Sequence, residues 1–215
     1  MTETYVETQT GHRWRDPRPV WRALALFYGV EILVYLLFTL YGALVLSQAQ
    51  YWLPPDLAVV ADSASLALNR IAVPIFIICA GLTMALTYIL IANAHALEPS
   101  TKLTKPAMAI ASYFIPLICL FMPPAVMGQL WRATFGASGR QPHGIIALWW
   151  SAFLIAAFIG TWAAFAESSA DASKLVRGQT LGFVSRIIAA STLLYIFSSI
   201  VSQQLLSQRS RPEAT

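Results

Sequence analysis

Long apolar runs alternate with short polar segments along most of the chain. Four runs, residues 23–46, 71–92, 145–166 and 181–201, are close to the length of an apolar helix that crosses the hydrocarbon core, about 20 residues. We therefore expect an all-α integral membrane bundle of four to five transmembrane helices. The helical domain is predicted over residues 23–203, after an N-terminal tail at 1–22 and before a polar tail at 204–215.

A fifth apolar run, residues 107–122, is only 16 residues long and contains Pro116. The pair Pro123-Pro124 is expected to end it, because proline removes a backbone donor and disrupts a helix. The run either crosses the membrane fully or re-enters it as a short broken segment, and its length slightly favours re-entry. Residues 126–135 then fit a short amphipathic helix at the membrane interface.

Finer patterns predict how the helices begin and pack. Residues 56–68 fit a separate short amphipathic helix before the second span, and Pro74 would lie in the first turn of that span. Small residues repeat every four positions in the run 145–166, which predicts close helix contacts and a central position. The repeating residues are Ala152, Ala156, Gly160 and Ala164.

Composition agrees with a lipid environment: 57% of the residues are hydrophobic and 11% are charged, whereas soluble domains average about 25% charged. The positive charges lie mostly between apolar runs, which fits membrane orientation and does not fit nucleic-acid binding. With four spans the 14 Lys and Arg divide ten inside against four outside, and with five spans nine against five. Both counts place the Arg-rich N-terminus on the cytoplasmic side of the membrane.

Two ionisable residues lie within apolar runs and are candidates for function, since charge is costly at membrane depth. Glu31 is about 12 Å into its helix at 1.5 Å per residue. Arg186 is one turn inside the last run. The two could form a structural ion pair, or a protonated Glu31 could bond a neighbouring hydroxyl. The alternative functional role is a proton or ion relay. A relay needs more than one acid within the apolar runs, and Glu31 is the only one found there.

The remaining reactive side chains form no recognisable catalytic, haem or metal set. Cys79 and Cys119 lie inside apolar runs and are interpreted as packing residues. His95 is the one plausible haem ligand, yet no second ligand faces it, so we expect an interfacial histidine and no cofactor. No zinc spacing and no phosphate-binding glycine loop occurs.

A set of short motifs in the middle of the chain has a characteristic order and spacing. The motifs are Asn93-Ala94 with Leu97, Phe114-Ile115-Pro116, Pro123, Met127, Trp131-Arg132-Ala133-Thr134 and Trp149-Trp150. In this respect the chain resembles a bacterial family of polytopic membrane proteins known as domain of unknown function 4328. The resemblance implies a membrane protein with several spans and supplies no activity. Cys119 and Met122 depart from the Asn and the basic residue usual in that family.

The absence of a catalytic set favours a non-catalytic role. The leading hypothesis is an accessory subunit or scaffold whose broken segment and cytoplasmic rim bind a lipid or another membrane protein, or a second copy of the chain. The alternative is a small transporter or channel-like subunit that uses Glu31 and the helix break between Pro116 and Pro123.

Overall fold

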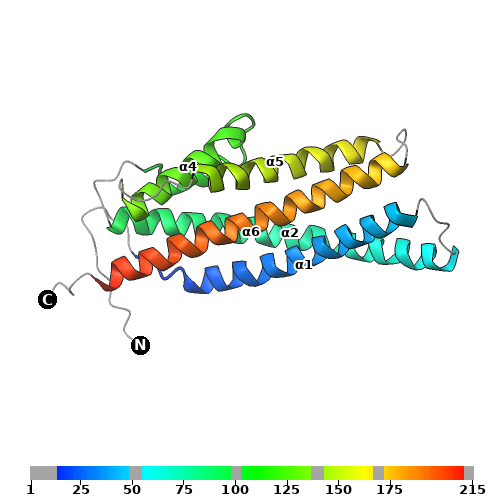
Figure 1. Cartoon of the computed structure of the whole chain (residues 1–215). Helices are drawn as coiled ribbons and strands as arrows, with labels where there is room; N and C mark the ends of the chain where they lie inside the picture. Colours follow the sequence, from blue (N-terminus) through cyan, green and yellow to red (C-terminus); the bar gives the residue numbers. More distant parts are fainter. Residues whose placement is uncertain (1–13, 49–54, 98–102, 137–142, 167–171, 211–215) are drawn as a thin grey trace. The chain divides into compact units, whose positions relative to one another are not determined.

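The computed structural model describes residues 14–48, 55–97, 103–136, 143–166 and 172–210, and every regular element among them is helical. The prediction of an all-α fold is therefore confirmed (Figure 1). The six helices are α1 (Arg18–Gln48), α2 (Pro55–Leu97), α3 (Pro106–Ala111), α4 (Ile118–Phe135), α5 (His143–Ala166) and α6 (Ala172–Arg209).

Four of the described helices are long and apolar enough to cross a membrane. Their apolar stretches are Arg18–Val45, Arg70–Leu97, His143–Trp162 and Arg177–Arg209. Large apolar side chains lie outward on these helices: Leu26, Leu40 and Phe158 are each at least 66% exposed. A water-soluble monomer rarely exposes extensive apolar surface. The chain is therefore a multi-pass membrane protein.

The second span begins differently from the sequence-based expectation. Residues 56–68 do not form a separate helix, because α2 runs without interruption from Pro55 to Leu97. Pro74 consequently lies deep inside α2 and not in its first turn. A proline removes one backbone donor, a loss that a long helix can tolerate when its neighbouring turns remain hydrogen-bonded. At the other end of the chain, α6 continues to Arg209, beyond the expected start of the polar tail at residue 204.

The chain divides into two compact units, and each long helix contributes to both. Unit 1 combines Met1–Ala25, Ala80–Ala147 and Leu194–Thr215. Unit 2 combines Leu26–Cys79 and Leu148–Leu193.

Unit 2 has an aromatic core. The Phe38 and Phe183 rings stack with centroids 4.8 Å apart, and the Tyr35 and Phe183 rings stack at 5.8 Å. Val34, Ile75 and other buried residues complete this cluster. Such offset ring pairs add dispersion and quadrupole attraction, which matters in lipid because hydrocarbon offers no hydrophobic drive between helices.

Close helix contacts in unit 2 come from glycines that the small-residue pattern did not single out. A Cβ on Gly182 would lie 3.2 Å from Ile159, and one on Gly178 would lie 3.0 Å from the Trp162 ring. The expected small face of α5 is only partly used: Ala156 is buried, but Gly160 is exposed and has open space around it.

The expected central position of α5 is also wrong. In the most apolar 18-residue stretch of α5, only 28% is buried, whereas 44% of the corresponding stretch is buried in α2 and in α6. At these contacts the small residues, Gly178 and Gly182, belong to α6. The large side chains that pack against them, Trp162 and Ile159, belong to α5.

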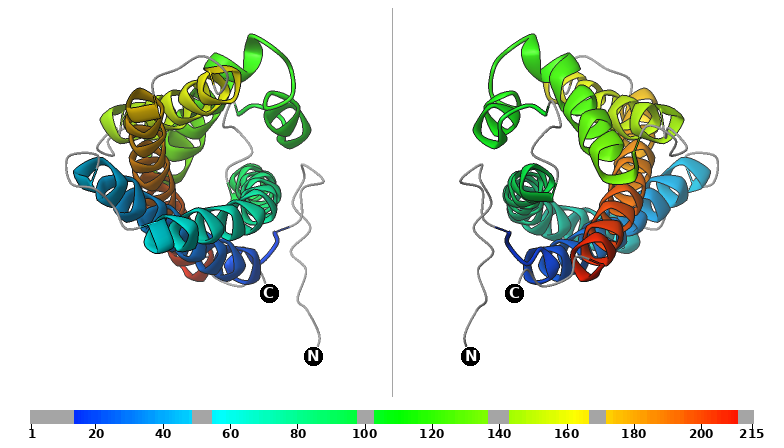
Figure 2. Two further views of the ribbon diagram at one scale, coloured as in Figure 1. Left: turned by 90° about the vertical axis from the view of Figure 1, so that its right-hand side faces the viewer. Right: turned by 90° about the vertical axis from the view of Figure 1, so that its left-hand side faces the viewer.

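In unit 1, the run 107–122 is broken into two helices. Figure 2 shows the short α3 and the longer α4 as separate green pieces joined by a turn. The turn contains Leu117, whose φ of +64° is uncommon for a residue other than glycine. Pro123 and Pro124 do not end the segment as expected, because both lie inside α4.

The turn between α3 and α4 satisfies several of its own backbone donors. The N–H of Phe114 donates to the carbonyl of Ala111 at 3.0 Å, and that of Cys119 to Ile115 at 2.9 Å. Thr104, just before α3, donates through its backbone N–H and its hydroxyl to the side-chain oxygen of Gln129 on α4. These bonds hold the broken segment together without help from water, as an apolar medium requires.

Candidate functional site

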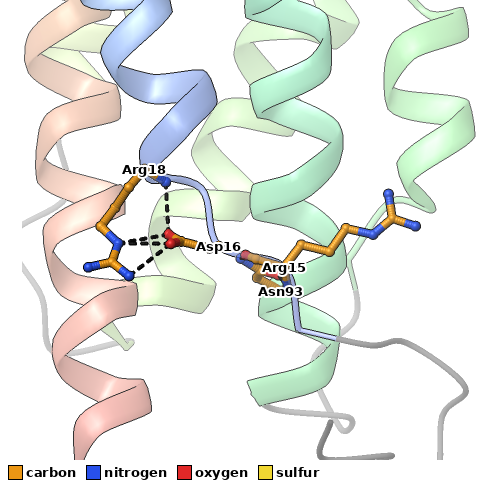
Figure 3. A network of polar contacts seen from close by, with 4 residues as sticks. All are labelled: Arg15, Asp16, Arg18 and Asn93. Carbon is orange, nitrogen blue, oxygen red and sulfur yellow. Dashed lines mark hydrogen bonds and ion pairs between the residues drawn. The ribbon is translucent and has the colours of Figure 1, made fainter. Parts of the chain in front are cut away.

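Asn93, near the end of α2, clamps the segment that precedes α1. Its side-chain oxygen accepts a hydrogen bond from the backbone N–H of Arg15, and its amide donates to the carbonyl of Arg15, both at 2.8 Å. Figure 3 shows this segment passing α2 at Asn93. A short carboxamide suits this role because it offers one acceptor and a donor side by side. Asn93 is fully buried, so both bonds are protected from competition.

Directly after the clamped Arg15, an ion pair between Asp16 and Arg18 lies at the start of α1. Asp16 accepts hydrogen bonds from the backbone N–H of Arg18 at 3.0 Å and from its guanidinium at 2.9 Å (Figure 3). The Arg18 hydrogen bond holds the pKa of Asp16 below its ordinary value. Both side chains are about half exposed, so the pair orders the helix start more than it stabilises the fold. The Arg15 guanidinium points away and lies 5.9 Å from the centre of the Tyr88 ring.

A second carboxamide, that of Gln204 on α6, is also fully buried in unit 1. Its amide nitrogen donates to the carbonyl of Leu90 at 3.0 Å. Its oxygen has no hydrogen-bond partner among the residues that the structure describes. Because a buried polar atom without a partner is costly and uncommon, this oxygen marks a candidate binding position.

The Gln204 side chain lines a pocket of about 320 Å³ in unit 1, within the range of small-molecule sites. The walls come from the C-terminal ends of three helices: Ala94 and Leu97 of α2, Thr134 and Phe135 of α4, and Gln204 and Ser207 of α6. Several of these residues belong to the sequence motifs described above. The structure thus brings the Asn93-Ala94, Leu97 and Ala133-Thr134 motifs to one place.

The other motif residues have different surroundings. Met127 and Trp131 are buried on α4, and the Trp131 ring stacks on Phe135 at 4.3 Å. Arg132 is exposed. His95 is half-buried in the last turn of α2 and does not line the pocket.

Three further motifs lie elsewhere in the chain. Pro116 is exposed at the helix break, and Pro123 is buried inside α4. Trp149 and Trp150 are buried in unit 2 with ring centroids 5.1 Å apart. The motifs therefore do not form one site.

An apolar groove of about 490 Å³ follows the helix break in unit 1. Met108 and Ser112 line it on one side of the break, and Leu117, Ile118, Phe121 and Ala125 line it on the other. Ser112 is the one polar side chain in the lining, and its hydroxyl donates to the carbonyl of Ala109 at 2.7 Å. Met122 also lines the groove, where a basic residue would have placed a charge.

Glu31 is buried in unit 2 with 3% of its surface exposed. The Cys79 thiol donates a hydrogen bond to one carboxyl oxygen, so the neighbouring donor is a thiol and not the hydroxyl considered above. The other oxygen, Oε2, has no partner within the described ranges. Arg186 attracts Glu31 electrostatically but makes no direct ion pair with it, because its guanidinium lies over the Phe76 ring at 4.4 Å.

The family can be assigned by comparison. The family model described as a domain of unknown function, DUF4328, matches residues 50–202, which is most of the chain. The protein belongs to this family. The matched range includes both ends of the helix break, the pocket walls on α2 and α4, and all but the end of α6.

No curated protein and no solved structure matches the chain. Among the described residues, no group of three His, Cys, Asp or Glu side chains could hold a metal ion.

The clamp predicts a local effect of changing Asn93. Replacing Asn93 with Leu removes both bonds to Arg15 and should cost about 1–3 kcal/mol, because two backbone groups lose their partner. The segment should then detach, and tryptic cleavage after Arg15 should accelerate by roughly tenfold or more. Asn93→Asp keeps the acceptor and should give an intermediate rate. Equal cleavage rates in all three proteins would show that the clamp does not hold the segment.

Proposed function

We propose that this protein is a non-catalytic membrane protein that binds lipid, holding an acyl chain in the groove at the break between α3 and α4. The observation that carries the proposal is the groove itself, whose lining offers hydrocarbon contacts and no free hydrogen-bonding side chain. Its volume is within the range of ligand sites.

The surroundings of the groove support a hydrocarbon occupant. Phe114, Leu117 and Phe121 at the break are 70–75% exposed. Side chains of this size are unfavourable in water by about 25 cal/mol for each Å² exposed, so the break is expected to lie in the apolar layer. The backbone hydrogen bonds across the turn remove the main obstacle to that position. A lipid chain is the apolar ligand that such a layer supplies.

Filling the groove tests this proposal. Ala125 is exposed and lines the groove, whereas Ala107 is exposed on α3 outside it. We expect Ala125→Trp to lower the amount of phospholipid that stays bound through detergent purification by about tenfold, and Ala107→Trp to leave it unchanged. Native mass spectrometry of the purified proteins measures the retained lipid. A folded Ala125→Trp protein with undiminished lipid would refute acyl binding in the groove.

The proposed location is the bacterial inner membrane with both ends in the cytoplasm. Support comes from the four apolar helices found among the described residues, an even number, and from the ten-to-four division of Lys and Arg between the two sides. Single cysteines placed at Thr2 and Thr215, in a chain with Cys79 and Cys119 changed to Ala, should resist a membrane-impermeant thiol reagent in intact spheroplasts. Rapid labelling at either position would contradict the cytoplasmic location of that end of the chain.

A transport function is the second candidate, and the unpartnered carboxyl oxygen of Glu31 is the observation that favours it. In a proton-coupled carrier this acid would gain and release a proton during each cycle. A lipid-binding protein has no such requirement, and a neutral Gln keeps the shape of Glu and can still accept from Cys79.

We therefore expect Glu31→Gln to retain its bound lipid and to change the free energy of unfolding by less than about 1 kcal/mol. Vesicles containing the wild-type protein or this variant should show the same proton permeability, measured with a trapped pH-sensitive dye. Cys79→Ser, which preserves a donor to Glu31, is the matched control. Proton movement by the wild type and Cys79→Ser that Glu31→Gln abolishes would establish the carrier in place of the proposed function.

A further inference from the structure

The hydrogen bond to Leu90 fixes the orientation of the Gln204 side-chain amide. The carbonyl of Leu90 can only accept, so the amide nitrogen of Gln204 must face it. The side-chain oxygen is therefore the atom left without a partner within the described parts of the chain. A ligand that satisfies this oxygen must donate a hydrogen bond, because a carbonyl oxygen has no proton to give.

The walls of the pocket favour a positive ligand. The pocket lies at the last turns of α2, α4 and α6, where the final carbonyls of each helix carry a partial negative charge. None of the side chains that line it is charged. The Phe135 ring forms one wall, held by stacking on Trp131, and an aromatic face attracts ammonium groups.

We propose that this pocket binds a primary ammonium group, such as the ethanolamine headgroup of a phospholipid or a free amine. The N–H bonds of the ammonium donate to the Gln204 oxygen and to helix-end carbonyls, and its charge lies against Phe135. A quaternary ammonium would keep the aromatic contact but could not donate to Gln204. An anion would be repelled by the three carbonyl ends.

The position of the pocket suits a headgroup. Leu97, in its wall, ends the apolar stretch of α2, and Ser207 lies in the last turn of α6. The ends of membrane-spanning helices lie at the level of lipid headgroups. This inference concerns a different pocket from the acyl groove and does not depend on that groove being occupied.

The test compares two phospholipids with identical acyl chains, one with an ethanolamine and one with a choline headgroup. Each is titrated into the purified full-length protein in detergent, and binding is measured by native mass spectrometry. We expect the wild type to prefer the ethanolamine lipid by about tenfold, the usual effect of one hydrogen bond to a charged group. Gln204→Leu should abolish the preference, while Gln203→Leu, at the adjacent partly buried glutamine, should keep it.

A second variant covers the case in which Gln204→Leu does not fold. Phe135→Leu leaves the bond between Gln204 and Leu90 intact and should weaken binding of both headgroups by about two- to fivefold through loss of the ring face. By contrast, Ala125→Trp should weaken both lipids equally without changing the headgroup preference. The proposals for the acyl groove and for the ammonium pocket are therefore tested separately, and either one can be refuted without the other.

Free ethanolamine distinguishes the two sources of the ammonium group. If millimolar ethanolamine displaces the ethanolamine lipid from the wild type but not from Gln204→Leu, a soluble amine is sufficient as the ligand. If the headgroup preference is present and ethanolamine does not compete, the ligand is the lipid. Equal binding of the two lipids by the wild type, together with no effect of ethanolamine, would overturn the proposal.

Discussion

The hydrocarbon core of a bilayer cannot hydrogen-bond to protein, and this constraint shapes most of the structure. Every polar group at membrane depth must find its partner within the chain. Helices satisfy their own backbones, and the turn between α3 and α4 does so with local bonds such as that from Cys119 to Ile115. Buried threonines follow the same rule, since the Thr87 hydroxyl donates to the carbonyl of Thr83 one turn earlier. Polar atoms without a partner are therefore informative in this protein.

Two such atoms belong to Gln204 and Glu31, and they differ in chemistry. The Gln204 side chain lines a pocket at the ends of three helices, and its oxygen is buried beside that pocket. The Glu31 oxygen lies in the unit 2 core, where Arg186 attracts the carboxyl electrostatically, and Glu31 lines neither of the two pockets described above. A pocket makes a ligand the natural partner of the first atom. The second is held in a packed interior, which is typical of a structural acid or of a proton site.

The lipid-binding proposal and the ammonium proposal both use unit 1, and both follow from irregular backbone. The groove lies along the break in the run 107–122, and its lining comes from both α3 and α4. The pocket forms where three helices end together.

The sequence by itself determined the fold class, the four apolar runs long enough to cross a membrane and the interruption near Pro116, because hydrophobic length and proline chemistry are local properties. Tertiary structure decided the rest. Gln204 follows the last apolar run and was assigned to a polar tail, yet contact with Leu90 buries it completely. Asn93 was recognised as a motif residue, but its partner lies 78 positions away. The close packing of Gly182 against Ile159 likewise depends on which helix faces another. Pairings between distant segments arise only when the helices assemble, and a one-dimensional pattern does not contain them.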